Sequence, residues 1–455
     1  MQNLVLTAFL GCMLALGFKR PFIWVLCYLY IDIVAPQAVS WGFLAIVPTS
    51  LIGFALAFGG WILFDRKDDA RFHFRQAILL FLLIYCGYTT LTADFPVEAA
   101  GKWSWVWKAL VFAIFLPLTL RTRLRIEAVI LTMVLSVATI VVGGGIKTAL
   151  GGGGYGVLRL LVDNNTGLYE GSIISCFAIA VIPLILWLVK HGTIFPDEWR
   201  TRAFAAALIF ACTLMPIGTQ ARTGLLCLGF LCALILRTTK RRFLYMGLMA
   251  VAVAIAVPFL PQSFTDRMST IENHKADESA STRIAVWKWT LDYVKHNPVG
   301  GGFEVYLGND LRYETVESEE AGSTTLVETQ TVTDHGRAFH SSYFEMLGEQ
   351  GYLGLLLWLL LHATGVLQME LVRRRWKDRT GEDERWVAPL AVALQQANLV
   401  YLLGAAFVGI AYQPLILMIV GVQCGLWTYL RRIETPAPRI ARGAREMTPV
   451  GPAAT

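Results

Sequence analysis

The sequence predicts an all-α, polytopic integral membrane protein with 12 or 13 transmembrane helices and one large loop. Of its 455 residues, 55% are hydrophobic and only 16% are charged, whereas about 25% of residues are charged in a soluble domain. Apolar stretches of roughly 15–25 residues recur along the chain, long enough to cross a hydrocarbon core of about 30 Å as helices. Between two of these stretches lies a single long polar segment, residues 262–345.

The apolar stretches give the expected spans in order. They lie near residues 3–18, 21–37, 41–64, 76–92, 104–120, 126–146, 170–190, 202–220, 223–237, 243–261, 346–372, 387–411 and 414–430. The first two are short and could form one broken hairpin, which leaves the count at 12 or 13. The run from Leu4 to Leu16 lacks a basic region before it and a small-residue cleavage site after it, so we expect a retained span rather than a signal peptide.

The net charge of +6 is clustered, and the clusters predict the topology. Basic groups stand at Lys19–Arg20, 121–125, 237–242, 373–379 and in the tail from Arg431 to Arg445. By the positive-inside rule these segments are cytoplasmic, so the loops near 93–103, 147–169, 220–223, 262–345 and 411–414 lie on the other side. Topology accounts for the basic groups, so we expect the lipid bilayer, and no nucleic acid, as their partner. The eight cysteines lie in apolar runs and predict neither disulfides nor a thiolate metal site.

Four segments follow from this pattern: 1–261, transmembrane helices with short loops; 262–345, the large loop; 346–430, the C-terminal transmembrane helices; and 431–455, a disordered cytoplasmic tail. Within the loop, "STRIAVWKWTLDYVKHNP" predicts an amphipathic helix capped by Ser281 and ended by Pro298. Its expected apolar face carries Ile284, Trp287, Leu291 and Val294. This helix either lies along the bilayer surface or packs against the other helices. "GGGF" (300–303) then turns the chain back.

Two arginines are candidate anion ligands. Arg222 is the only charge in "TLMPIGTQARTGLLCLGFLCALIL", and an arginine at a helix centre in the membrane costs a few kcal/mol. It either reaches out to lipid headgroups or binds an anion such as phosphate through two parallel hydrogen bonds. Arg283 stands at the start of the loop helix, where the helix dipole disfavours a cation unless an anion offsets it.

His340 and Lys108 complete the set of candidate functional side chains. His340, in "RAFHSSYFEMLGEQGYLG", is either structural or a general base, because the pKa of histidine lies near neutrality. Glu345 and Glu349 follow it by one and two turns and either orient the imidazole or cap the span. Lys108 lies one to two turns into its span, where it either extends to the interface or marks a functional site, and Lys102 is expected to be more exposed.

The glycine-rich segment 143–165 does not match a phosphate-binding loop, because Ile146 stands before Lys147 and no Gly-x-x-x-x-Gly-Lys-Ser/Thr occurs. We interpret it as a mobile loop whose last residues, Asp163 and Asn165, contact a sugar. No Asp-x-Asp, His-x-x-x-His or close carboxylate pair occurs on the non-cytoplasmic side, so we expect no metal and no other cofactor. Any phosphate handled there must be bound by arginine and lysine.

Three motifs in order carry a family resemblance: "QARTG", then "RIAVW" followed by "NPVGGGF", then "FHSSYFEMLGEQGYLG". Within a chain of many spans and one big loop, they resemble those of the O-antigen ligase/polymerase superfamily. "KRPFIWVLCYLYIDIVAPQAVSWGF" and "GGGYGVLRLLVDNN" are similar to the branch of O-glycosylation ligases associated with exosortase systems. The resemblance runs from residue 1 to about residue 430.

The resemblance implies a C-type glycosyltransferase of the bacterial inner membrane that is inverting and independent of metal. Such an O-antigen ligase moves a glycan from undecaprenyl diphosphate to lipid A–core oligosaccharide at the periplasmic face. Arg222 and Arg283 would bind the diphosphate and His340 would be the catalytic histidine, while Lys108 matches a basic position of the family. "TQAR" stands where many relatives have a Ser-Arg pair, which puts a hydroxyl contact at that position in doubt.

Three other functions remain open at this point. A polymerase of the same superfamily would use a growing glycan as acceptor, and a protein O-glycosylation ligase would use Ser or Thr. A transporter of lipid-linked glycans belongs to another class, and it should show paired repeats and polar residues at mid-membrane. Here the notable polar residues gather on one side of the membrane with the large loop, which favours an enzyme.

Overall fold

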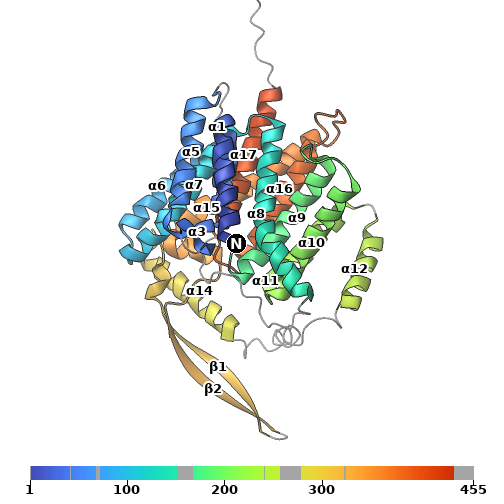
Figure 1. Ribbon diagram of the computed structural model, residues 1–455. Coiled ribbons are helices and arrows are strands. Elements are labelled where there is room, and N and C mark those ends of the chain that lie inside the picture. Colours follow the sequence, from blue (N-terminus) through green and yellow to red (C-terminus); the bar gives the residue numbers. More distant parts are fainter. Residues whose placement is uncertain are drawn as a thin grey trace, which may run out of the picture.

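The computed structural model describes residues 2–40, 43–67, 72–150, 168–239, 241–256, 278–321 and 324–434, and it is a bundle of long helices (Figure 1). The predicted all-α membrane fold is confirmed. The helices of the N-terminal half are α1 (Gln2–Lys19), α2 (Phe22–Val34), α3 (Pro36–Val39), α4 (Phe43–Ile46), α5 (Thr49–Phe64), α6 (Phe74–Leu91), α7 (Pro96–Thr119), α8 (Arg123–Leu150), α9 (Gly171–His191), α10 (Trp199–Gly218), α11 (Arg222–Thr238) and α12 (Arg242–Ala256). The C-terminal helices of the bundle are α15 (Ser342–Trp376), α16 (Val387–Ala405) and α17 (Pro414–Glu434).

Each predicted apolar stretch coincides with a helix of the bundle. Eight helices in the described ranges, α6–α10 and α15–α17, are long and apolar enough to cross a membrane, by length and composition. Three more, α1 from Asn3 on, α2 and α5, are apolar but shorter. The chain is therefore a multi-pass membrane protein, and the count of 12 or 13 spans stays a prediction. The tail beyond residue 434 lies outside the described residues.

The most enclosed helices are α9 and α17, whose apolar windows are 78% and 83% buried in the protein. Helix α17 packs against α7, and α9 packs against α10 and α16. In Figure 1, α12 stands apart at the edge of the bundle. Helix α15 packs against α16 and α6, so the central helices bring together parts of the chain that are far apart in the sequence.

One end of the bundle bears an arm made of the predicted large loop (Figure 1). The arm contains α14 (Glu278–His296), the 3-10 turn η2 (Val305–Gly308) and an antiparallel hairpin of β1 (Asp310–Ala321) and β2 (Thr324–His335). The hairpin register pairs Asp310 with His335 and Ala321 with Thr324. The all-α prediction did not include these two strands, although Thr and Val are frequent in the segment.

The amphipathic helix forms where it was expected, but its details differ. It is already helical at Glu278, so Ser281 lies inside the helix instead of capping it. The expected apolar face is wrong in part: Ile284 is 50% exposed and Leu291 is 47% exposed, whereas Val294 is buried and Trp287 packs against buried neighbours. The helix instead packs on β1 and α15 and buries a row spaced by four residues: Thr282, Val286, Thr290 and Val294. Because two of its four residues are threonines, hydrophobic periodicity alone does not predict this row.

The predicted turn at "GGGF" docks on a kink in α15. Gly300 has φ +87° and Gly302 has φ +77°, and within α15 Gly351 has φ +62° and ψ −164°. Backbone hydrogen bonds join the two segments: Gly301 N donates to Gly348 O at 3.0 Å and Gly302 N donates to Glu349 O at 2.9 Å. A Cβ on Gly300 would lie 2.5 Å from Gly351 N, so glycine is required for this approach. The turn therefore holds the residue that follows it, Glu304, against the first turns of α15.

Candidate functional site

A cavity of about 670 Å³ opens at the end of the bundle that carries α14. Its walls come from the starts of α7, α9 and α15, from α14, and from the segments around residues 304–306, 338–340 and 407–413. Its ionisable lining residues, apart from tyrosine, are Glu98, Lys102, Glu170, Arg283, Glu304, His340, Glu345 and Glu349. Two residues that the sequence predicted for the site, Arg283 and His340, thus line one cavity although they are far apart in the sequence.

His340 is held by its buried neighbour. Trp287 Nε1 of α14 donates a 2.9 Å hydrogen bond to Phe339 O, and the ring of Phe339, only 3% exposed, closes against Gly348. His340 itself has φ +49°, a left-handed conformation that few residues other than glycine adopt. Such strained backbone persists only where the surrounding structure fixes it. The imidazole is therefore presented to the cavity from a rigid support.

The electrostatics keep the imidazole of His340 neutral. Although the side chain opens to solvent through the cavity, burial by the surrounding protein lowers its pKa below 6.5, and the positive charges of Arg283 and Arg337 lower it further. The carboxylate of Glu170 opposes this effect in part. At pH 7 the ring is consequently a proton acceptor, as a general base requires.

Arg222 lies close to the cavity without lining it. It opens α11 two residues after Gln220, whose φ is +52°. The preceding Thr219 shares a 2.7 Å hydrogen bond between hydroxyls with Ser175 of α9, and its side chain touches the backbone of Gly171. The start of α11 therefore abuts the start of α9, whose Glu170, Ser172 and Ile173 line the cavity.

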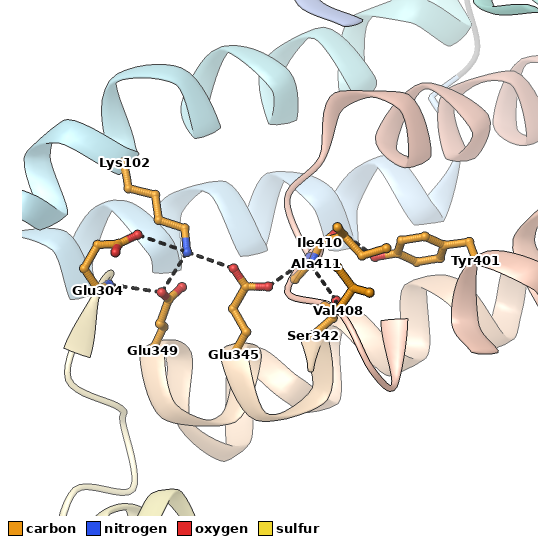
Figure 2. A network of polar contacts seen from close by, with 9 residues as sticks. All are labelled: Lys102, Glu304, Ser342, Glu345, Glu349, Tyr401, Val408, Ile410 and Ala411. Atoms are coloured by element: carbon orange, nitrogen blue, oxygen red, sulfur yellow. Dashed lines mark hydrogen bonds and ion pairs between the residues drawn. The ribbon is translucent and has the colours of Figure 1, made fainter. Parts of the chain in front are cut away.

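Lys102, which also lines the cavity, is the centre of a polar network (Figure 2). Its Nζ donates hydrogen bonds of 2.8 Å to Glu345 Oε1 and of 2.8 Å to Glu349 Oε1, and it lies 3.5 Å from Glu304 Oε1. Glu349 Oε1 also accepts a 3.0 Å hydrogen bond from Glu304 N. The lysine side chain is 11% exposed, and its ammonium lies 5.2 Å from the centre of the Tyr412 ring. One cation thus joins α7, the glycine turn and α15.

The network continues into the segment that precedes α17. Glu345 Oε2 accepts a 3.1 Å hydrogen bond from Ala411 N. Ser342 Oγ accepts a 2.8 Å bond from Ile410 N and donates a 2.8 Å bond to Val408 O, as Figure 2 shows. Glu345 and Glu349 were expected to orient the imidazole or to cap the span. They pair with Lys102 instead, and the carboxylate that acts on the His340 pKa is Glu170.

The remaining predicted site residues lie elsewhere. Lys108 donates a 3.1 Å hydrogen bond to Ser50 Oγ of α5 and is not among the residues that line the cavity. Asp163 and Asn165 lie outside the described residues. Lys102 and Glu304 were missed as site residues. The polar start of α7, "PVEAAGKWSW", was the available signal for Lys102, because the helix begins eight residues before the expected span.

An apolar groove of about 920 Å³ runs between α1, α2 and α8. Val5 and Phe9 of α1 and Leu135, Ala138 and Ile140 of α8 are among its walls, and Lys147 stands near its end. Tyr169 also lines it and donates a 2.7 Å hydrogen bond to Val34 O, while the next residue, Glu170, lines the cavity. The groove and the cavity are therefore adjacent, with the start of α9 between them.

No divalent metal site stands out in the described ranges, since they hold no group of three or more His, Cys, Asp or Glu side chains placed to bind an ion. The lysine and arginine side chains that line the cavity are Lys102 and Arg283. Together with a neutral imidazole, they provide a proton acceptor and a stabilising positive charge within one enclosed space.

Two protein families match parts of the chain. Residues 1–193 match a family described as a family of unknown function (DUF5935). Residues 204–359 match the family described as O-antigen ligase, and this range contains Arg222, Arg283, His340 and the glycine turn. Among curated proteins, none matches the chain. The motifs, the helical membrane fold and this match over residues 204–359 together support the O-antigen ligase superfamily.

Proposed function

We propose that the protein is an O-antigen ligase of the bacterial inner membrane, with its active site at the periplasmic face. It transfers a glycan from undecaprenyl diphosphate to lipid A–core oligosaccharide. The observation that carries this proposal is that a neutral imidazole, His340, and a guanidinium, Arg283, line one cavity and interact electrostatically. A transferase of this kind needs a base for the acceptor and a cation for the leaving group, and the family match supports that class.

The proposed reaction is a single displacement. His340 takes the proton of an acceptor hydroxyl, and the oxygen attacks the anomeric carbon of the donor sugar. The bond between that carbon and the diphosphate oxygen breaks, so the configuration inverts. Arg283, with Arg222 behind it at the start of α11, stabilises the negative charge that develops on the departing diphosphate. Charge stabilisation by arginine does not require a metal ion.

The apolar groove is our candidate for the prenyl tail of the donor. Its walls suit a hydrocarbon chain, and Lys147 near its end suits an anionic headgroup. The cavity that contains His340 adjoins this groove at the start of α9. A donor seated in this way would extend its diphosphate from the groove toward Arg283.

The test uses purified protein in detergent with lipid-linked glycan and lipid A–core, and a gel reports the product as a ladder. The informative variant is His340→Asn, because asparagine tolerates the left-handed backbone but cannot act as the base. We expect transfer to be abolished while donor binding and thermal stability stay near the wild type. Transfer by His340→Asn at the wild-type rate would refute the assignment of the base.

The same assay separates the rival functions. A transporter has no activity without a closed compartment, so product formation in detergent excludes it. Lipid-linked glycan supplied without lipid A–core reports polymerase activity, and a peptide rich in Ser and Thr reports protein glycosylation. Absence of product with every acceptor would refute the transferase proposal as a whole.

A further inference from the structure

The cavity is acidic although its proposed donor is an anion. Five carboxylates and two permanent cations line it, which leaves a formal charge of −3 while His340 is neutral. A cavity built only to hold a diphosphate would carry the opposite sign. The excess of carboxylates therefore indicates that the cavity also binds a ligand group of different chemistry.

The charged residues of the cavity form two groups. In the first, Arg283 of α14 and Glu170 act on His340. In the second, Lys102 lies within reach of three carboxylates, at 2.8, 2.8 and 3.5 Å. Its Nζ donates hydrogen bonds to Glu345 and Glu349, so Lys102 is engaged by carboxylates. Counted in their ionised forms, the four side chains carry a formal charge of −2. We refer to Lys102, Glu304, Glu345 and Glu349 as the carboxylate cluster.

A second observation shows that the cluster has an acceptor atom to spare. Glu349 is fully buried at 0% exposure, and its Oε2 has no hydrogen-bond partner among the described residues. Buried carboxylate oxygens are rarely left in this state, because a missing hydrogen bond there costs about 1–3 kcal/mol or more. Glu349 is among the residues that line the cavity, which places this oxygen in the cavity wall.

We propose that the carboxylate cluster is the subsite for the acceptor sugar, where hydroxyl or amino groups donate to the glutamates, and that it rejects an acceptor sugar carrying phosphate or carboxylate. This inference rests on the proposed function. Glutamate oxygens accept hydrogen bonds from hydroxyls, whereas a second anion beside a charge of −2 is repelled. The acceptor hydroxyl would then lie between the cluster and His340, opposite the cations that hold the diphosphate.

The test compares two acceptors that differ only in the terminal sugar, a neutral hexose and the corresponding uronic acid. For the wild type we expect kcat/KM to be larger for the hexose by on the order of 10- to 100-fold, since like charges at this range repel strongly in a partly buried site. The ratio should shrink at high salt. Equal use of both acceptors by the wild type would overturn the inference and leave the proposed function standing.

The variant that probes the cluster is Glu345→Gln/Glu349→Gln, which keeps an oxygen acceptor at both positions. We expect it to lose most of the preference for the hexose, mainly through a lower KM for the uronic acid, while the KM for the donor stays unchanged. Glu98→Gln is the matched control, because it removes one carboxylate from the exposed rim, outside the cluster, and should keep the preference. A thermal unfolding scan of each variant identifies loss of fold.

Three results decide the matter. A double variant that folds and keeps the full wild-type preference would overturn the role of the cluster. An equal loss of preference in Glu98→Gln would also overturn the role of the cluster, because the preference would then depend on the total charge of the cavity. If the wild type transfers glycan to neither acceptor, the proposed function fails first.

Discussion

The backbone contact between the glycine turn and the kink of α15 gives a prediction for Gly351→Ala. Gly351 has φ +62° and ψ −164°, a region open almost only to glycine, where another residue costs about 1–3 kcal/mol. The new Cβ would press on Pro298 O and lie 2.5 Å from Val299 C and 2.7 Å from Gly300 N. These are backbone atoms that cannot rotate away, so overlap adds about 1–3 kcal/mol. The sum is about 2–6 kcal/mol.

The assay is thermal inactivation in detergent, read as the apparent midpoint and as the half-life at a fixed temperature, since large membrane proteins unfold irreversibly. We expect Gly351→Ala to lower the midpoint by several degrees and to reduce transfer, because the turn positions Glu304 beside Glu349. Gly229→Ala is the control. It adds the same methyl group within α11 where nothing lies within 4 Å, and alanine favours a helix by about 1 kcal/mol. If the two variants have the same midpoint and activity, the contact does not hold the turn.

Four further predictions concern the chemistry. Because the pKa of His340 lies below 6.5, kcat/KM should be constant near neutral pH and fall only as the pH drops through that lowered pKa; a midpoint above 6.5 would contradict this. Arg283→Gln removes a positive charge that lowers the pKa of His340, so the acid midpoint of the residual activity should shift to higher pH. Arg283→Lys keeps the charge and should lose less activity than Arg283→Gln, on the order of tenfold. Ala138→Trp narrows the groove and should raise the KM for a donor with a long prenyl chain but not for a short-chain analogue; equal effects on both would argue against the tail site. EDTA should leave transfer unchanged, and inhibition that added Mg²⁺ or Mn²⁺ reverses would contradict phosphate binding by arginine alone.

Hydropathy predicted the helical membrane fold because each helix of the bundle must be apolar along most of its length. Arg283 became a candidate through its place at the start of the loop helix and His340 through the near-neutral pKa of histidine, and the family resemblance implied a role for both. Arg283 and His340 line one cavity because α14 packs on α15. Patterns within single segments of the sequence do not predict this packing.

Lys102 shows what the sequence could not supply. Hydropathy set the start of its span at residue 104, because the residues before it are polar, and so Lys108 was the lysine expected inside the span. The helix in fact begins at Pro96, and Lys102 finds partners that stand 243 and 247 residues away in the chain. Pairing a buried lysine with distant carboxylates is a property of the fold, and no local pattern predicts it. The β-hairpin was missed for another reason, because its Thr and Val residues are weak evidence for a strand within a polar loop.

Three of the four left-handed residues other than glycine in the described part of the chain, Gln220, Glu304 and His340, stand at or beside the cavity. Each carries a conformational penalty that glycine would relieve. A laboratory selection for thermostability alone should therefore enrich substitutions at these positions, because Gln220→Gly or Glu304→Gly removes backbone strain. A screen that scores heat resistance without scoring transfer should accumulate changes around the cavity and yield stable proteins with diminished turnover.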